Sequence, residues 1–371
     1  MSNACIEWMA RDTRGGRYTV ARKATAQDVA DLAGVSRSAV SLVLNGRAQG
    51  HIARHRQQAI IEAARRLNYT PNAVALSLRS RRTRTIGVLI WPGESGFSLP
   101  MLHATLESAT AAGYLLIFMD TANDHDHQNR ALATLHDHQV DALLVMAPDL
   151  ISYSPVEVMS TIPTILVNCV DPNAGLTSIV ADEHGAGCAA ARVLIESGHI
   201  SIGVIGGPSD AMQSRQRLAG IEQTAEAAEH VELSIQTAVN RDINAGFAAA
   251  RTLLLAQPRP TALICTHERL AVGAALAAAN LGVRIPADLS LVSLDDGEHL
   301  AAQLVPRLAT IERPDRAMAK QAVTMTLERF EDETERSIQQ LTFSCSPILR
   351  DSVARPRRRA SRGPCGPADI R

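Results

Sequence analysis

The sequence lacks the long apolar segments that cross a membrane. Hydrophobic residues make up 46% of its 371 residues, yet no run approaches the ~18 apolar residues of a transmembrane helix. Charged side chains interrupt residues 1–20, which therefore lack the apolar core of a secretory signal. We expect a cytoplasmic protein with no membrane partner.

The sequence is also poor in cysteine. It has six, and no two lie within four positions of each other, which excludes zinc ribbons and CxxC redox motifs and gives no sign of a disulfide framework. Two histidine pairs, His125/His127 and His136/His138, have i, i+2 spacing, which does not place both imidazoles on one helix face. We interpret them as surface histidines and predict no metal site.

Motifs of the common catalytic classes are missing as well. The sequence contains no GxSxG nucleophile elbow, no GxxxxGK[ST] phosphate loop and no HExxH zinc motif. The glycines of residues 203–207 do not form the GxGxxG pattern of dinucleotide sites. We therefore predict that the protein is not an enzyme and uses no cofactor.

What the sequence does have is a strong separation of charge. Residues 1–85 carry 15 basic and 5 acidic side chains, a net charge of +10, whereas residues 86–354 have a net charge of −16 and residues 355–371 one of +5. A basic head on an acidic body favours a head that meets a polyanion. The alternative is a basic segment that serves only solubility.

Three short helices are expected in the basic head. Thr25 is a hydroxyl N-cap, Gly34 allows a sharp turn, and Ser36 caps a second helix that ends at Asn45-Gly46. A third helix is expected over about residues 53–68. The apolar positions that should face a common core are Val29, Leu32, Ala33, Val40, Val43, Leu44, Ile60, Ala63, Ala64, Leu67 and Tyr69.

Two short helices around an Ala-Gly-Val-Ser turn predict a helix-turn-helix. The outer positions of the second helix are Arg37, Ser38 and Ser41. Arg can bond both acceptors of guanine, and Ser can bond a base edge or a phosphate. A three-helix protein–protein module is the alternative interpretation.

A second DNA-type element follows the third helix. Residues 73–79 would form a helix too short to be stable alone, with Leu78 and Arg79 at its end and a run of arginines after it. Such a segment suits folding on DNA, with Leu78 entering a base step from the minor groove.

The stretches TAQDVADLAGVSRSAVSLVLNG and NYTPNAVALSLRSRRTRTIGVLI resemble the head and hinge of the lactose-repressor (LacI/GalR) family of bacterial transcription regulators. The resemblance covers residues 25 to about 350. It implies DNA contacts by the recognition helix, contacts to the DNA backbone and a wedge at Leu78. The residues at these positions are Ser36, Arg37, Ser38 and Ser41 for the helix, and Thr25, Asn45 and His51 for the backbone.

The body reads independently as two similar α/β lobes. Apolar strands alternate with helices, first over residues 86–167 and again over residues 186–294, which predicts parallel sheets covered on both faces. Ligands of such sheets bind at the carboxyl ends of the strands, here in a cleft between the lobes. This is the layout of a periplasmic-type binding protein, and the family resemblance implies it too.

Candidate cleft residues lie just after strand ends. They are Phe97, Asp182, Arg217, His267 and Asp295. An Arg with carboxylates suits a polyhydroxylated effector; the alternative for Arg217 and Asp295 is an intramolecular ion pair.

This sequence departs from the family pattern at several positions. Leu42 stands where many members have a base-reading Arg, His267 and Glu268 stand where Asn and Asp are usual, and Arg313 replaces a neutral residue. These departures favour a carbohydrate effector less strongly, and a more acidic or nucleoside-like effector is the alternative.

The predicted domains follow from these patterns. We expect a flexible arm over residues 1–24, a helix-turn-helix domain over 25–72, a hinge helix and linker over 73–85, a two-lobed body over 86–350 with crossings between lobes near 181, 311 and 341, and a disordered basic tail over 351–371. The predicted function is that of a ligand-responsive repressor, a homodimer that binds a palindromic operator on double-stranded DNA. The alternatives are a solute-binding protein and an α/β enzyme fused to a DNA-binding head.

Overall fold

The computed structural model describes residues 24–70, 82–91, 98–121, 124–297, 300–331 and 338–357. The chain divides into two compact units with the boundary after Thr83. The predicted hinge helix over 73–79, the wedge residue Leu78, Arg79 and the cleft residue Phe97 lie outside the described residues. None of the described helices has the length and apolar character needed to cross a bilayer.

The first unit contains the three predicted helices, α1 (Ala26–Ala33), α2 (Arg37–Leu44) and α3 (Arg54–Arg66). Thr25 and Asp28 form a reciprocal capping box at the start of α1, and Gly34, with φ at 64°, ends it in the left-handed conformation. The small core contains Val29, Ala30, Val40, Ile60, Ala63 and Ala64, with Leu67 and Tyr69 packed against it. The inward orientation predicted for Leu32 is wrong: 46% of this residue is exposed, and Ala30 is buried in its place.

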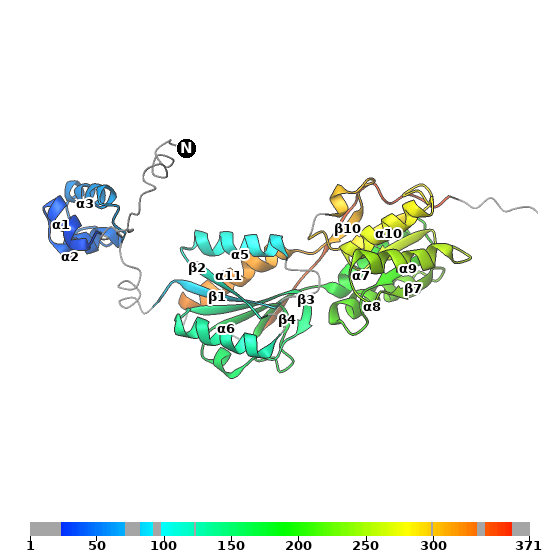
Figure 1. Ribbon diagram of the computed structural model, residues 1–371, viewed down its shortest axis with the longest axis horizontal. Coiled ribbons are helices and arrows are strands. Elements are labelled where there is room, and N and C mark those ends of the chain that lie inside the picture. Colours follow the sequence, from blue (N-terminus) through cyan, green and yellow to red (C-terminus); the bar gives the residue numbers. More distant parts are fainter. Residues whose placement is uncertain are drawn as a thin grey trace, which may run out of the picture. The chain divides into compact units, whose positions relative to one another are not determined.

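The second unit opens with an α/β lobe built on a six-stranded sheet of order β11-β5-β4-β3-β1-β2. Its strands are β1 (Thr85–Ile90), β2 (Leu115–Asp120), β3 (Ala142–Ser152), β4 (Thr164–Val170), β5 (Thr177–Ala181) and β11 (Gln340–Phe343). All its strand pairs are parallel. Helices α5 (Leu99–Ala111) and α11 (Asp315–Glu331) cover one face and α6 (His125–Asp137) the other (Figure 1), with a short 3₁₀ turn at Glu157–Ser160.

The second lobe repeats this plan with the order β12-β10-β9-β8-β6-β7. Its strands are β6 (Ser201–Gly206), β7 (Glu232–Thr237), β8 (Ala262–Cys265), β9 (Ser290–Leu294), β10 (Ala309–Glu312) and β12 (Ser346–Ile348), of which only β12 pairs antiparallel. Helices α7 (Glu183–Glu196) and α8 (Met212–Glu226) pack on one face, and α9 (Ile243–Leu255) and α10 (Glu268–Asn280) on the other. A 3₁₀ turn follows at Ala301–Gln303.

The chain passes between the two lobes three times within the described residues. The passages follow β5 at residue 182, β10 at residues 313–314 and β11 at residues 344–345. The ordered fold also continues past the predicted start of the tail at residue 351. Ser352 is fully buried and its hydroxyl donates to the carbonyl of Leu291, so a disordered tail beginning at 351 is wrong for residues 351–357.

Candidate functional site

The start of α2 presents the polar surface expected of a recognition helix. Ser36 caps the helix by accepting a hydrogen bond from the backbone N–H of Ala39. Arg37 and Ser38 are exposed, while Val40 on the opposite side is buried in the core. The N-terminal end of α2 therefore carries free donor groups, which is the end that reaches base edges in a helix-turn-helix.

Three further predicted DNA contacts lie on the same unit. Thr25 is engaged with Asp28 in the capping box. The side-chain amide of Asn45 donates to the carbonyl and hydroxyl oxygens of Ser41, at 2.6 and 3.2 Å, so both residues help to end α2. His51 is exposed in the loop before α3.

In the body, Arg217 is the centre of a buried ion-pair network. The residue is 1% exposed. Its Nε donates to Glu183 at 2.6 Å, and its two terminal nitrogens donate to both carboxylate oxygens of Asp295, at 2.7 and 2.6 Å. One of them also donates to the carbonyl of Thr266. The alternative interpretation of Arg217 and Asp295, an intramolecular ion pair, is therefore present in the structure.

Asp295 is positioned by the end of β9 and by an unusual backbone. Its φ of 73° lies in the left-handed region, which Asp tolerates better than most residues. Burial opposes ionisation of this carboxyl group, but Arg217 and Arg313 hold its pKa well below the usual range. Asp295 retains 20% side-chain exposure and lines a cavity between the lobes.

His267 completes the network from the start of α10. Gln213 donates its amide N–H to Glu183 at 2.7 Å, which turns its carbonyl oxygen toward His267 Nε2 at 3.2 Å. The imidazole therefore donates from Nε2, and Nδ1 accepts from the hydroxyl of Thr266 at 3.0 Å. Burial, reinforced by the charge of Arg217, lowers the pKa of His267 well below its ordinary value, so the ring is neutral.

Asp182 does not join this network. Its carboxylate caps α7 by accepting from the backbone N–H of Gly185 at 2.8 Å. The next residue, Glu183, is fully buried and holds Arg217. The sequence analysis named Asp182 and not Glu183, because the role of Glu183 depends on the partner that it meets in the folded lobe.

Two arginines connect the lobes. Arg241, which follows β7, forms an ion pair with Asp149 of β3, and both side chains are largely buried. Arg313 pairs with Asp315 and donates to the carbonyl of Pro148 at 2.6 Å. Despite the burial that opposes its charge, Asp315 and Asp295 raise the pKa of Arg313. The sequence analysis missed Asp149, although it too lies near the carboxyl end of a strand.

A cavity of about 480 Å³ opens between the lobes beside Asp295. Its walls come from α5 of the first lobe, the β9 and β10 ends of the second lobe, and the passage into α11; they include Leu99, His103, Asp295 and Arg313. Ser98 at the start of α5 also donates to Asp315. Residues of both lobes therefore contribute to one space.

Several buried polar atoms have no hydrogen-bond partner in the described part of the chain. They include Thr121 Oγ1, the Gln128 amide, Asn168 Oδ1, Ser214 Oγ and Arg241 Nε. Thr121 directly follows β2, and Gln128 lies in the first turns of the next helix, α6. Each such group is unfavourable by about 1–3 kcal/mol while it has no partner.

The described residues hold no group of three or more metal-ligating side chains. His127 contacts Asp124 at 2.7 Å. The described cysteines, 169, 188, 265 and 345, are free thiols.

Comparisons with known proteins agree with this architecture. Residues 25–72 match the family model described as bacterial regulatory proteins, lacI family, and residues 191–353 match a periplasmic binding protein-like domain. The lac repressor dimer bound to operator and the anti-inducer ONPF has a similar fold, with a TM-score of 0.75 over 90% of this chain and 100% of that one, at 23% identity.

Curated relatives extend over nearly the whole chain. The ribose operon repressor of Haemophilus influenzae is 32% identical over 89% of this chain and 98% of its own length. The HTH-type transcriptional repressor PurR of Klebsiella pneumoniae is 34% identical over 89% of this chain and 97% of its own. The chain has a helix-turn-helix head followed by a two-lobed body, and the curated relatives match it along both parts. It therefore belongs to the lacI family of bacterial regulatory proteins, which are transcription regulators and not enzymes.

Proposed function

We propose that this regulator is a repressor that binds a palindromic operator as a homodimer and responds to a small polar molecule held between its two lobes. The observation that carries the proposal is the cavity beside Asp295, to which both lobes contribute, in a chain whose head presents an exposed Arg37 and Ser38. DNA as the partner favours the cytoplasm as the location.

The homodimer follows from the size of the reading surface. A single recognition helix reads only a half-site, so a specific site needs two heads related by two-fold symmetry. In this arrangement Ser36, Arg37, Ser38 and Ser41 read the major groove, while Thr25, Asn45 and His51 contact the backbone. Leu78 and Arg79 are proposed for the minor groove from the sequence alone.

The effector site is proposed around Arg217, His267 and Asp295. Arg217 is fully occupied by Glu183 and Asp295, so it positions the partly exposed Asp295 at the cavity rather than offering free donors. The Asp295 carboxylate in the cavity lining accepts hydrogen bonds, which suits a ligand rich in hydroxyl or ring N–H groups, while His267 supports the network behind it. A sugar or a nucleoside-like metabolite has this chemistry.

The effector acts by binding two arrangements of the lobes unequally. A ligand shifts such an equilibrium only by its difference in affinity for the two states. The Asp149–Arg241 pair and the contact of Arg313 with Pro148 join the lobes, and a ligand that changes these contacts changes how the lobes are held. The same change alters DNA affinity.

The test is selection of bound sequences from random duplexes with the full chain, repeated with a panel of sugars, nucleosides and nucleobases. We expect a two-fold symmetric site and one compound that changes the affinity of the protein for it.

Arg37→Ala should weaken operator binding by about 1–3 kcal/mol and relax base preference. Asp295→Asn should remove the response to the compound. If no duplex is preferred over a scrambled competitor under any condition, the proposal is wrong.

A further inference from the structure

A second cavity, of about 180 Å³, lies at the amino ends of the strands of the second lobe. It is lined by residues that precede or begin β6, β8 and β9, namely His199, Thr261 and Leu289, and by the chain segment after β12. The proposed effector site uses the carboxyl ends of these strands. Since β6 has six residues, the two sites lie about 20 Å apart along the sheet.

Positive charge gathers at this cavity. Arg259 and Arg357 line it, and within the described chain neither makes an ion pair. The carboxylate of Asp288, also in the lining, is held by Arg284 at 2.7 and 2.9 Å. Hydrogen bonds from Arg284, with a contribution from the charge of Arg357, hold the pKa of Asp288 well below its usual range. The Arg284–Asp288 ion pair is neutral overall, so the guanidinium groups of Arg259 and Arg357 leave this part of the lining with a net charge of +2.

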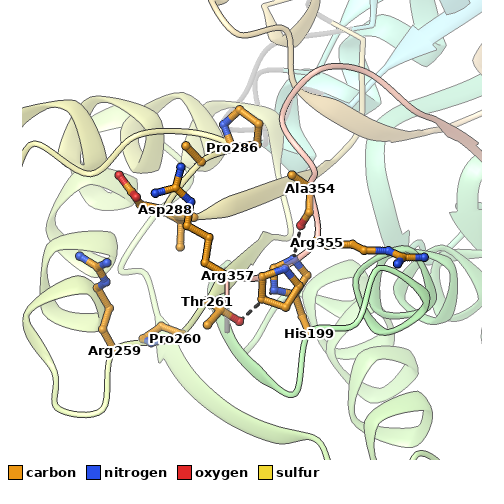
Figure 2. Close-up of a pocket in the computed structure, with 12 residues that line it drawn as sticks. His199, Arg259, Pro260, Thr261, Pro286, Asp288, Ala354, Arg355 and Arg357 are labelled. Carbon is orange, nitrogen blue, oxygen red and sulfur yellow. Dashed lines mark hydrogen bonds between the residues drawn. The ribbon is translucent and has the colours of Figure 1, made fainter. Parts of the chain in front are cut away.

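A proline lies next to each of the two unpaired arginines and restricts the backbone there. Arg259 precedes Pro260, and Arg357 follows Pro356, and both prolines line the cavity with Pro286. Figure 2 shows Arg357 directed toward Asp288, and Arg355 directed away from it. A site with two guanidinium forks and apolar proline walls suits a small anion with several oxygens.

A buried histidine fixes the segment that carries Arg357. His199 is 1% exposed; its Nε2 donates to the carbonyl of Ala354 at 2.9 Å, and its Nδ1 contacts the hydroxyl of Thr261 at 2.8 Å (Figure 2). The backbone N–H of Ala354 in turn donates to the hydroxyl of Ser290 at 3.0 Å. Because residue 354 is held on two sides, Arg357 is positioned only three residues from a fixed point.

We propose that this cavity is a second ligand site, which binds the phosphate group of a small phosphorylated metabolite between Arg259 and Arg357. The phosphate oxygens accept from the two guanidinium groups, and the prolines contact the carbon skeleton. A phosphate monoester is preferred over a carboxylate, because its dianion better matches the net charge of +2. The proposal is independent of the DNA site and of the effector cleft.

Equilibrium titration of the full chain with glycerol 3-phosphate tests this proposal, at an ionic strength held constant with chloride. Glycerol and inorganic phosphate are the parallel ligands. We expect one saturable site per chain for glycerol 3-phosphate. Inorganic phosphate should bind this site more weakly, and glycerol should not bind it. In the double variant Arg259→Gln/Arg357→Gln the affinity should fall at least tenfold, whereas Arg130→Gln, which removes an exposed arginine from the other lobe, should leave it unchanged.

Thermal unfolding of the double variant should match that of the parent, because neither arginine makes an ion pair within the described chain. Three results would overturn the proposal. One is unchanged affinity in the double variant, and another is an equal loss in Arg130→Gln. The third is loss of binding in Asp295→Asn but not in the double variant, which would assign the phosphate to the cleft between the lobes.

Discussion

Arg217 shows how one side chain organises the second lobe. It satisfies two carboxylates and a backbone carbonyl while almost completely removed from water. Removing one member of a buried ion pair leaves the other charge without compensation, which is more unfavourable than losing an exposed pair.

Arg217→Met is therefore expected to destabilise the protein by about 3–5 kcal/mol. Glu183 and Asp295 would lose the guanidinium group that bonds both of them. Urea unfolding followed by circular dichroism measures the change, with Arg130→Met as the exposed control. A loss below about 1 kcal/mol would indicate that the two acids find other partners.

Two buried histidines give the stability a defined dependence on pH. Burial lowers the pKa of both His199 and His267 below 6.5, the value expected for the unfolded chain. The unfolded state therefore binds more protons at mildly acidic pH, and folding stability decreases as pH falls below about 6.5. Above this pH their contribution is fully present.

The melting temperature should thus be lower at pH 5.5 than at pH 7.5, and this difference should shrink in His267→Asn. Asn keeps a polar side chain at this position but does not titrate. His230→Asn, at an exposed position, serves as the control and should keep the parental difference. Equal differences in all three proteins would exclude His267 as a source of the pH dependence.

At the scale of elements, glycine determines how closely the helices of the second lobe pack. A Cβ added at Gly220 of α8 would lie 2.0 Å from the carbonyl oxygen of His184 in α7, and one at Gly273 of α10 would lie 2.1 Å from that of Ile243 in α9. Both helix pairs thus pack backbone against backbone, one pair on each face of the sheet.

Gly220→Ala is expected to destabilise the protein by about 1–3 kcal/mol, since the clash with backbone outweighs the ~1 kcal/mol that Ala gains in helix propensity. Arg217 lies one turn away on α8, so its network should be disturbed as well. Gly297→Ala, where an added Cβ meets nothing within 4 Å, is the matched control. Thermal unfolding measures the change in stability of both variants.

The elements that the sequence predicted are those with the clearest patterns. The apolar strands β1, β6, β8 and β9 lie, to within one residue, inside the stretches 86–167 and 186–294 where alternating strands and helices were predicted. The edge strand β7 escaped detection because it has no apolar run and is largely exposed. Helix α11 escaped too, since its role depends on the return of the chain to the first lobe, which local spacing does not encode.

Part of the candidate site was also predictable from the sequence. The rule that ligands bind after strand ends found Arg217, His267 and Asp295, which the structure brings into one network. It did not find Glu183 or Arg241, because their roles depend on which partner faces them across the fold. Pairing of side chains distant in sequence is a property of the packed molecule.

At the scale of the whole molecule, the Asp149–Arg241 ion pair joins the two lobes. Asp149→Asn would leave the Arg241 guanidinium largely buried without a carboxylate. We expect the effector-free protein to shift toward an arrangement with the lobes farther apart, seen as a larger radius of gyration by small-angle X-ray scattering.

Glu107→Gln is the matched control, because it breaks an exposed pair with Arg316 inside one lobe. Its scattering curve should superimpose on that of the parent. If Asp149→Asn also superimposes, the pair does not hold the lobes together.

The three passages between the lobes have a consequence for chimaeras and for exchange of gene fragments. Each lobe is assembled from separate stretches of the chain, so replacing one of them with that of a relative requires a recombination joint at every passage. The head is a single stretch that ends near Thr83, and one joint suffices to transplant it. New DNA specificities should therefore be far simpler to graft onto this sensor than a new half of the sensor itself.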